Sequence, residues 1–354
     1  MNRKVQAALG AAAGLSLALT GCSTVADSDE DTSTGAEAET STDSSVLAPE
    51  DMTMVTVVKV QGIGWFDRMS TGVTDFAERT GVDARQEGGD DNSAEKQIAI
   101  IQDLIAQKPT AITVVPNDPA SLSTVLKQAQ DEGIIVVSHE ASGIENVDVD
   151  IEAFDNASYG ENIMTNLAEC MSEEGEYVQF VGGLTAKTHM EWVGAAYDLQ
   201  AESYPNMTRV EDPIESTDNE AVAYDRAREI LAKYPDIKGF QGSAGNDVPG
   251  IARAVEEAGL EDQICVMGTS IPSQSQKYLE TGSIDKIFFW DPALAGEAQL
   301  QIAMILAQGG TVEEGTDLGI EGYDSIRLLE GYDNVFVGDA AVAADAAKAS
   351  EYDF

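Results

Sequence analysis

The chain has 354 residues, of which 43% are hydrophobic, so it is long enough for about two globular domains. Aspartate and glutamate outnumber lysine and arginine by 63 to 20, which gives a formal net charge of −43 at pH 7. A charge of this size disfavours binding to nucleic acid, to an anionic membrane surface or to a phosphorylated ligand. The three cysteines and two histidines lack the spacing of zinc ligands, so no metal site is predicted.

The N-terminus has the pattern of a bacterial lipoprotein signal peptide. Arg3 and Lys4 precede a small apolar run over 5–19, which leads into Leu19-Thr20-Gly21-Cys22. The run is shorter than the ~20 residues that cross a bilayer, which disfavours a transmembrane helix. The pattern predicts a signal peptide over 1–22 and a lipid on Cys22, which would anchor the chain to the outer face of a membrane.

A polar segment separates this signal from the rest of the chain. Residues 23–51 are rich in Ser, Thr, Asp, Glu and Ala and contain few large apolar side chains. Such a segment buries too little surface to offset its chain entropy. It is predicted to be a flexible acidic linker.

From residue 54 onward, short β-branched runs alternate with amphipathic helical patterns. Ile98, Ile101, Leu104 and Ile105, for example, share one face of a helix predicted within 92–107. The predicted strands, in chain order, are 56–59, 111–115, 134–138, 177–181, 239–241, 264–268 and 284–289. This alternation is typical of parallel sheets covered by helices on both faces. It predicts an α/β fold with two Rossmann-like lobes, and a (β/α)8 barrel is the alternative.

The residues that follow the predicted strands are the candidates for a ligand site, because ligands of open α/β sheets bind outside the carboxyl ends of the strands. These positions are Lys59, 116–118, Glu140, 182–189, 243–247, 269–271, Trp290 and Asp291. Trp65, Phe66, Trp192 and Trp290 could stack on a sugar ring, while carboxylates and amides bond its hydroxyl groups. Asp291, at a strand end beside a tryptophan, is the strongest candidate for binding a hydroxyl group.

Motifs for catalysis and cofactor binding are missing from the sequence. The loop Gln61-Gly62-Ile63-Gly64 lacks the third glycine of a dinucleotide fingerprint, and no P-loop or G-x-S-x-G motif occurs. His139 and Glu140 follow a predicted strand and lack the second histidine of a zinc protease motif. No catalytic residue and no cofactor are therefore predicted. A surface glycosidase is disfavoured because nothing marks two carboxylates as a pair.

Several segments, taken together, resemble the autoinducer-2 and rhamnose receptors of the type I periplasmic binding protein superfamily. The likeness runs from about residue 57 to the end and rests on the segments 59–66, 136–140, 185–192, Asn246 with Pro249, 289–291 and 352–354. Lys59 matches the ligand-binding lysine of the autoinducer-2 receptors, and Glu140 stands where they have aspartate. Thr188 and His189 replace their Asp-Gln pair, and 243–245 replaces their Pro-Asp-Ala. The resemblance therefore implies a sugar or related polyol as ligand rather than autoinducer-2 itself.

The resemblance also implies an architecture and a function. It implies lobes formed by 52–155 with 286–320 and by 156–285 with 321–354, which close on a ligand by hinge bending. It implies a monomeric receptor, without catalytic activity, that delivers a sugar to an ABC permease and its ATPase subunit. The implied ligand-binding residues are Lys59, Trp65, Phe66, Glu140, Asp155, Thr188, His189, Ser243, Gly245, Asn246, Trp290 and Asp291.

Two alternatives stay open at this point. One is a receptor for autoinducer-2 or a nutrient that is coupled to signalling instead of transport. The other concerns Cys170 and Cys265, which could form a disulfide outside the cytoplasm or remain buried thiols.

Overall fold

The computed structural model describes residues 47–354. The predicted signal peptide, Cys22 and most of the predicted linker lie outside the described residues. The last linker residues include a short 3-10 helix, η1 (Pro49–Asp51), directly before the first strand. Within 47–354, every helix is too short or too polar to cross a bilayer.

The first sheet has the strand order β12-β13-β5-β4-β3-β1-β2. All neighbouring strands are parallel except β12 and β13, which are antiparallel. The strands are β1 (Thr53–Val58), β2 (Asp83–Gly88), β3 (Ala111–Val114), β4 (Ile135–His139), β5 (Val149–Glu152), β12 (Arg327–Leu328) and β13 (Val335–Val337).

The second sheet has the order β14-β11-β10-β9-β6-β7, and β8 pairs with the end of β6. Only β14 runs antiparallel to its neighbour. The strands are β6 (Gly175–Val181), β7 (Met207–Arg209), β8 (Ile214–Glu215), β9 (Ile237–Gly242), β10 (Cys265–Thr269), β11 (Lys286–Phe289) and β14 (Val342–Ala344).

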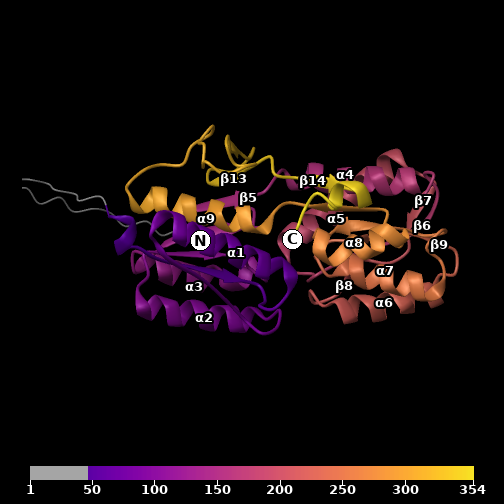
Figure 1. Ribbon diagram of the computed structural model, residues 1–354, viewed down its shortest axis with the longest axis horizontal. Coiled ribbons are helices and arrows are strands. Elements are labelled where there is room, and N and C mark those ends of the chain that lie inside the picture. The colour runs from indigo at the N-terminus through magenta and orange to yellow at the C-terminus, as the bar shows by residue number, and fades with distance from the viewer. Residues whose placement is uncertain (1–46) are drawn as a thin grey trace, which may run out of the picture. The chain divides into compact units, whose positions relative to one another are not determined.

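Helices cover both faces of each sheet, as strand-helix alternation requires (Figure 1). Around the first sheet, α1 packs with α9 and α2 packs with α3; around the second, α4 packs with α5 and α6 packs with α7. The helices are α1 (Gly64–Thr80), α2 (Ala94–Gln107), α3 (Pro119–Asp131), α4 (Asn156–Cys170), α5 (Lys187–Ser203), α6 (Glu220–Lys233), α7 (Asp247–Ala258), α8 (Pro272–Thr281), α9 (Pro292–Ala307) and α10 (Ala346–Ala349).

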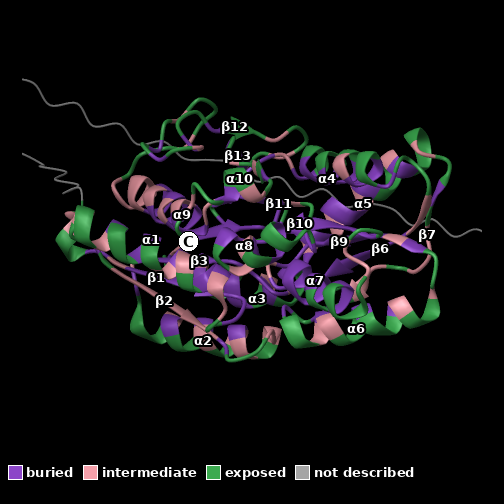
Figure 2. Ribbon diagram, turned by 45° about the vertical axis from the view of Figure 1, so that its right-hand side comes forward, coloured by how far each residue is buried: buried purple, intermediate pink, exposed green. Residues whose placement is uncertain are grey.

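The core follows from the two-residue period of the strands. In β1, Val55 and Val57 pack with the apolar faces of α2 and α3, while Met54 and Val58 belong to the larger core on the opposite face. All four side chains are fully buried. The strands are buried between helices whose outer faces are exposed (Figure 2). The predicted α/β fold with two parallel-dominated sheets is thus confirmed.

The chain passes between the two sheets three times. It crosses after β5 through residues 153–155, after β11 through 290–291, and after β13 through 338–341. The first and third crossings are joined, because the backbone N–H of Ala340 donates to the carbonyl oxygen of Ala153 at 3.0 Å. Two lobes tied by adjacent crossings have the arrangement that permits hinge bending.

The expected lobes assign strands differently from the observed sheets at two places. β11 lies in the second sheet although the expected boundary placed it in the first lobe, and β12 and β13 lie in the first sheet although they were expected in the second lobe. The reason is that the chain changes sheets after β11 and again after β13. We propose boundaries that follow these crossings, with a first lobe of 52–154 plus 291–337 and a second lobe of 155–290 plus 338–354.

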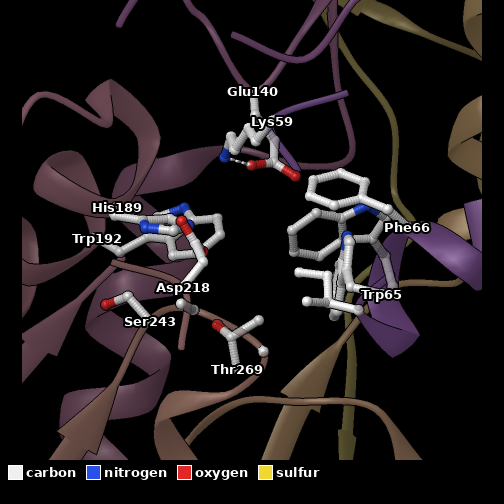
Figure 3. A pocket seen from close by; sticks show the side chains of 13 residues that line it. Lys59, Trp65, Phe66, Glu140, His189, Trp192, Asp218, Ser243 and Thr269 are labelled. Carbon is white, nitrogen blue, oxygen red and sulfur yellow. Dashed lines mark hydrogen bonds and ion pairs between the residues drawn. The ribbon is translucent and has the colours of Figure 1, made fainter. Parts of the chain in front are cut away.

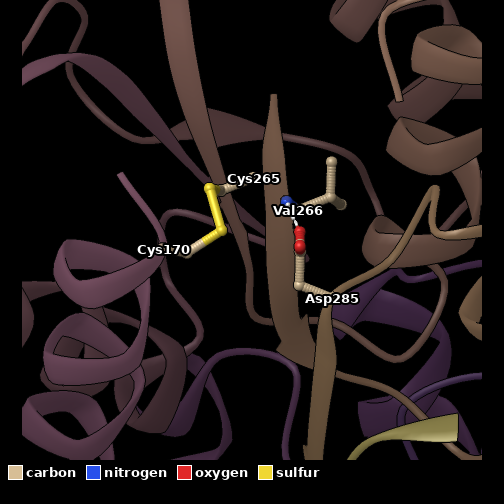
Figure 4. The surroundings of a disulfide bond; sticks show 4 residues. All are labelled: Cys170, Cys265, Val266 and Asp285. Carbon is tan, nitrogen blue, oxygen red and sulfur yellow. Dashed lines mark hydrogen bonds between the residues drawn. A yellow bond between two sulfur atoms is a disulfide. The ribbon is translucent and has the colours of Figure 1, made fainter. Parts of the chain in front are cut away.

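A disulfide joins Cys170, at the end of α4, to Cys265, at the start of β10 (Figure 4). Their Cα atoms are 6.1 Å apart and 95 residues separate them in sequence. Asp285 lies beside the sulfur atoms and accepts a hydrogen bond from the backbone of Val266 at 2.8 Å. This group is the one cluster among residues 47–354 with the spacing of metal ligands, and its sulfur atoms are already bonded to each other.

Candidate functional site

A small cavity lies between the two lobes, at the carboxyl ends of strands from both sheets (Figure 3). Its volume is about 20 Å³, which is room for about one water molecule. The lobes are therefore closed around it, and a ligand of monosaccharide size needs them to separate in order to enter. The lining residues are Lys59, Ile63, Trp65, Phe66, Glu140, His189, Trp192, Asp218, Ser243, Ala244, Gly245, Thr269 and Trp290.

The first lobe contributes a buried ion pair to the cavity. Lys59 follows β1, Glu140 follows β4, and the Lys59 ammonium donates a hydrogen bond to the Glu140 carboxylate. Each side chain is 4% exposed. Burial acts to raise the pKa of Glu140, but attraction to Lys59, with smaller effects of His139 and His189, holds that pKa below its ordinary value. The Glu140 carboxylate is therefore charged at neutral pH.

The backbone at Glu140 is held in an uncommon conformation. Its φ is +58°, in the left-handed region that non-glycine residues rarely adopt. Such strain concentrates at binding sites, where the surrounding structure fixes a side chain in a particular direction. At Glu140 it aims the carboxylate at Lys59 and the cavity.

Four aromatic side chains line the cavity. Trp65 and Phe66 begin α1 and face Trp192 of α5 across it, and Trp290 lies at the second crossing (Figure 3). The ring of Trp65 packs edge-on against that of Trp290, with 4.6 Å between centroids. The Trp65 ring also packs closely on Gly245, where a Cβ would lie 3.2 Å from the ring and would make a tight contact.

The second lobe contributes His189 and Asp218, which both lie against Gly182. The Nδ1 atom of His189 accepts a hydrogen bond from the Gly182 N–H at 3.2 Å, and burial lowers the pKa of His189 to about 3. The ring is therefore neutral, and its proton is on Nε2. A Cβ at position 182 would lie 2.5 Å from Asp218 Oδ1, so glycine is needed there for the carboxylate to reach the cavity.

Asp218 is held by three further features. Thr217 and Asp218 both have left-handed backbones, with φ of +56° and +53°. The Asn246 amide donates to the Asp218 carbonyl oxygen at 2.8 Å, and the Asn92 amide donates to Asp218 Oδ2. Burial raises the pKa of Asp218 to about 6, and repulsion from Glu140 adds to the effect, while Lys59 acts in the opposite direction.

Two lining residues carry fully buried polar atoms without hydrogen-bond partners among residues 47–354. These are the hydroxyl of Ser243 and the indole N–H of Trp290, both buried. Buried polar groups in proteins are nearly always hydrogen-bonded, so unpaired ones require an explanation. Both belong to side chains that line the cavity, which makes them candidates for bonding a polar ligand there.

The lobes are joined beside the cavity by side-chain hydrogen bonds. One runs from Asn92, in the loop before α2, to Asp218 in the second lobe. Another runs from the Ser142 hydroxyl, after β4, to the Glu191 carboxylate of α5 at 2.8 Å. These bonds stabilise the closed arrangement.

Four of the predicted site residues lie outside the cavity lining. Asp155 and Asp291 cap the helices α4 and α9, where each carboxylate accepts a backbone N–H of the first turn. Asp291 also forms a two-bond ion pair with Arg68, at 2.9 and 2.6 Å. Thr188 is buried in the first turn of α5, and Asn246 is used to hold Asp218. The geometry thus gives no support to Asp291 as the main hydroxyl-binding residue.

Asp218 is the residue that the sequence prediction missed. It follows β8, which has only two residues, and stands one residue before Asn219, which caps α6. The segment Ser216-Thr217-Asp218-Asn219 therefore has the pattern of a helix start. The available signal was an aspartate directly before the capping asparagine, since one capping residue is sufficient.

Fold and site together define a two-lobed α/β protein with a ligand cavity between its lobes, at the carboxyl ends of parallel strands. The chain belongs to the periplasmic binding protein domain family, whose model matches residues 54–311. The predicted resemblance to this superfamily is confirmed.

Relatives in this family include named sugar-binding proteins. The D-allose-binding periplasmic protein of Escherichia coli is 24% identical over 265 residues, covering 70% of this chain and 82% of that protein. The ribose import binding protein RbsB of Bacillus subtilis is 20% identical over 223 residues, covering 63% and 71%. These relatives are named as binding proteins, not as enzymes.

Solved structures with the same fold cover almost all of the described chain. LsrB from Clostridium saccharobutylicum, in complex with AI-2, has a TM-score of 0.79 at 20% identity and covers 86% of this chain and 100% of that one. An ABC transporter solute-binding protein from Clostridium phytofermentas, with bound L-rhamnose, has a TM-score of 0.79 at 20% identity and covers 85% and 99%.

Proposed function

We propose that this protein is the solute-binding receptor of an ABC importer and holds a monosaccharide or related polyol in the cavity between its lobes. The observation that carries the proposal is the composition of this cavity. Aromatic rings from both lobes surround Lys59, Glu140 and Asp218, and the unpaired Ser243 hydroxyl and Trp290 N–H lie beside them. Rings that stack on a sugar and polar groups that bond its hydroxyls are the two requirements for binding such a ligand.

The relatives support the class of ligand but do not identify the ligand of this chain. The curated relatives are named for allose and ribose, and the similar structures are complexes with AI-2 and L-rhamnose. All four ligands are small and rich in hydroxyl groups. The replacements at Glu140, His189 and 243–245, noted against the autoinducer-2 receptors, favour a ligand other than AI-2 for this chain.

The remaining parts of the proposal concern location and partners. The receptor works outside the cytoplasm, held by a lipid on Cys22 at the end of an acidic linker, and acts as a monomer. Closure of the lobes presents both of them to a membrane permease, whose ATPase subunit supplies the energy. The chain itself then needs neither a catalytic residue nor a cofactor. A permease gene and an ATPase gene beside this one would favour import over signalling.

A thermal-shift screen of the full chain in mild detergent tests the proposal. The panel holds pentoses, hexoses, 6-deoxyhexoses and AI-2. A ligand at 100 times its Kd stabilises the folded protein by about 2.7 kcal/mol. Ser243→Ala removes a cavity hydroxyl and should reduce the shift, whereas Ser273→Ala, at an exposed position on α8, should leave it unchanged. A screen without any saturable shift, or turnover of a panel sugar, would overturn the proposal.

A further inference from the structure

The charges around the cavity do not balance. Two lining residues are acidic, Glu140 and Asp218, and one is basic, Lys59. His189 is neutral because its Nδ1 accepts the Gly182 N–H. Lys59 is hydrogen-bonded to Glu140, so the carboxylate of Asp218 has no cation bonded to it among residues 47–354.

The surroundings of Asp218 increase this imbalance. Glu215 and Asp247 lie close enough to interact electrostatically with Asp218, and both are acids. Within 47–354, the hydrogen bond to its carboxylate comes from Asn92, whose amide is uncharged. A buried carboxylate without a bonded cation is costly, because its attraction to water is lost, and the attraction of Lys59, which is already paired with Glu140, offsets that loss only in part.

The structure nevertheless holds Asp218 firmly in place. Its left-handed backbone, the Asn246 bond to its carbonyl oxygen and the space left by Gly182 all fix one position. In that position the carboxylate points into the cavity, toward the Lys59–Glu140 pair (Figure 3). A strained residue kept in a costly environment is best explained by a ligand group that pairs with it.

The aromatic rings are compatible with a cationic ligand group. Trp65, Phe66, Trp192 and Trp290 line the same cavity as Asp218. The face of an aromatic ring attracts an ammonium group as well as the apolar face of a sugar. The net charge of −43 also favours the approach of cations.

We propose that the cavity selects a polyhydroxylated ligand that carries a protonated amine, such as an amino sugar, and that Asp218 pairs with the amine. This inference rests on the proposed function, since it names the class of ligand for the same site. The Lys59–Glu140 pair then bonds hydroxyl groups, and the aromatic rings hold the sugar ring. Asp218 is the residue that sets the preference for an amine over a hydroxyl group.

Calorimetric titration of the full chain with matched sugars tests this inference. The pairs are glucosamine and glucose, galactosamine and galactose, and mannosamine and mannose, which differ by one amino group. In at least one pair the amino sugar should bind about tenfold tighter or more. Asp218→Asn removes the charge at nearly constant shape and should abolish this preference. Glu215→Gln removes a nearby acid outside the lining and should keep it.

The outcomes show whether the inference alone fails or the proposed function fails as well. If neutral sugars bind as tightly as their amino partners, or if Asp218→Asn keeps the preference, the inference is wrong while the receptor function stands. If no sugar of either class binds, the proposed function fails with it. If Asp218→Asn does not fold, the inference is tested on the unaltered chain by measuring the protons released when each sugar binds. At pH 6, near the pKa of Asp218, amine binding should release about half a proton and neutral sugars none; equal release would overturn the inference.

Discussion

Replacing Lys59 with methionine would leave the Glu140 carboxylate buried without its cation. The two side chains are each 4% exposed, and no other described cation lines the cavity. Removing one partner of a buried ion pair costs about 3–5 kcal/mol, because the remaining charge keeps its desolvation penalty. We expect Lys59→Met to lower the free energy of unfolding at pH 7.5 by this amount.

The double variant Lys59→Met/Glu140→Met separates stability from binding. Two apolar side chains of similar length often replace a buried ion pair at little cost. The double variant should therefore recover most of the lost stability, to within about 2 kcal/mol of the original chain. It should nevertheless bind the ligand much more weakly, because two of the groups that bond hydroxyls are gone.

Urea denaturation, followed by circular dichroism at several pH values, measures these differences. The loss in Lys59→Met should shrink as the pH falls, since burial raises the pKa of Glu140 once its cation is gone, and a protonated Glu140 no longer needs a cation. A loss of less than about 1 kcal/mol at pH 7.5 would show that water reaches the pair. Full ligand affinity in the double variant would refute the role of both residues in binding.

Three further changes test other parts of the structure. Replacing Cys170 and Cys265 by serine should lower the free energy of unfolding by about 4.7 kcal/mol, the value for a loop of roughly 100 residues, as measured by urea denaturation with and without reductant. Asp150→Asn should raise the free energy of unfolding at pH 8 by up to about 4 kcal/mol, because burial raises the pKa of Asp150 from 3.8 to about 7. Asn92→Ala removes a hydrogen bond between the lobes and should weaken ligand affinity about tenfold, mainly through faster dissociation in stopped-flow measurements.

The pH dependence expected for Asp150 has a definite sign. The folded protein holds this proton more tightly than the unfolded chain, whose value is near 3.8. The contribution to stability is therefore full below pH 3.8 and is lost as the pH rises through about 7. If the free energy of unfolding has the same slope between pH 4 and 8 in Asp150→Asn as in the original chain, this reasoning is contradicted.

The other two predictions have their own contradicting outcomes. Equal unfolding midpoints with and without reductant would contradict the disulfide. A ligand affinity of Asn92→Ala within about twofold of the original would contradict the role of Asn92.

The sequence predicted the central strands well because their patterns are strong. The predicted strand 134–138 is observed as β4, since a buried β-branched run has few other interpretations. The predicted strand 239–241 lies within β9. The edge strand β2 was not predicted, because its sequence Asp-Ala-Arg-Gln-Glu-Gly is mostly polar. Its backbone pairs with β1 all the same, which is a tertiary effect that local pattern does not contain.

The site was predictable as a region but not residue by residue. The strand-end rule selected Lys59, Glu140 and Trp290, which do line the cavity. The same rule selected Asp291, whose carboxylate instead caps α9 and pairs with Arg68. A strand-end aspartate that begins the next helix and one that binds a ligand have the same local sequence. Only the direction of the side chain distinguishes them, and that depends on packing between segments distant in sequence.

The most direct test of the receptor proposal uses the intrinsic fluorescence of tryptophan. The chain has three tryptophans, and Trp65, Trp192 and Trp290 all line the cavity. A sugar that enters this cavity must therefore change the surroundings of every emitting residue. We predict a saturable change in emission on titration with the cognate sugar, with one ligand bound per chain. A sugar that binds by calorimetry but leaves the emission unchanged would place the ligand elsewhere and contradict the account.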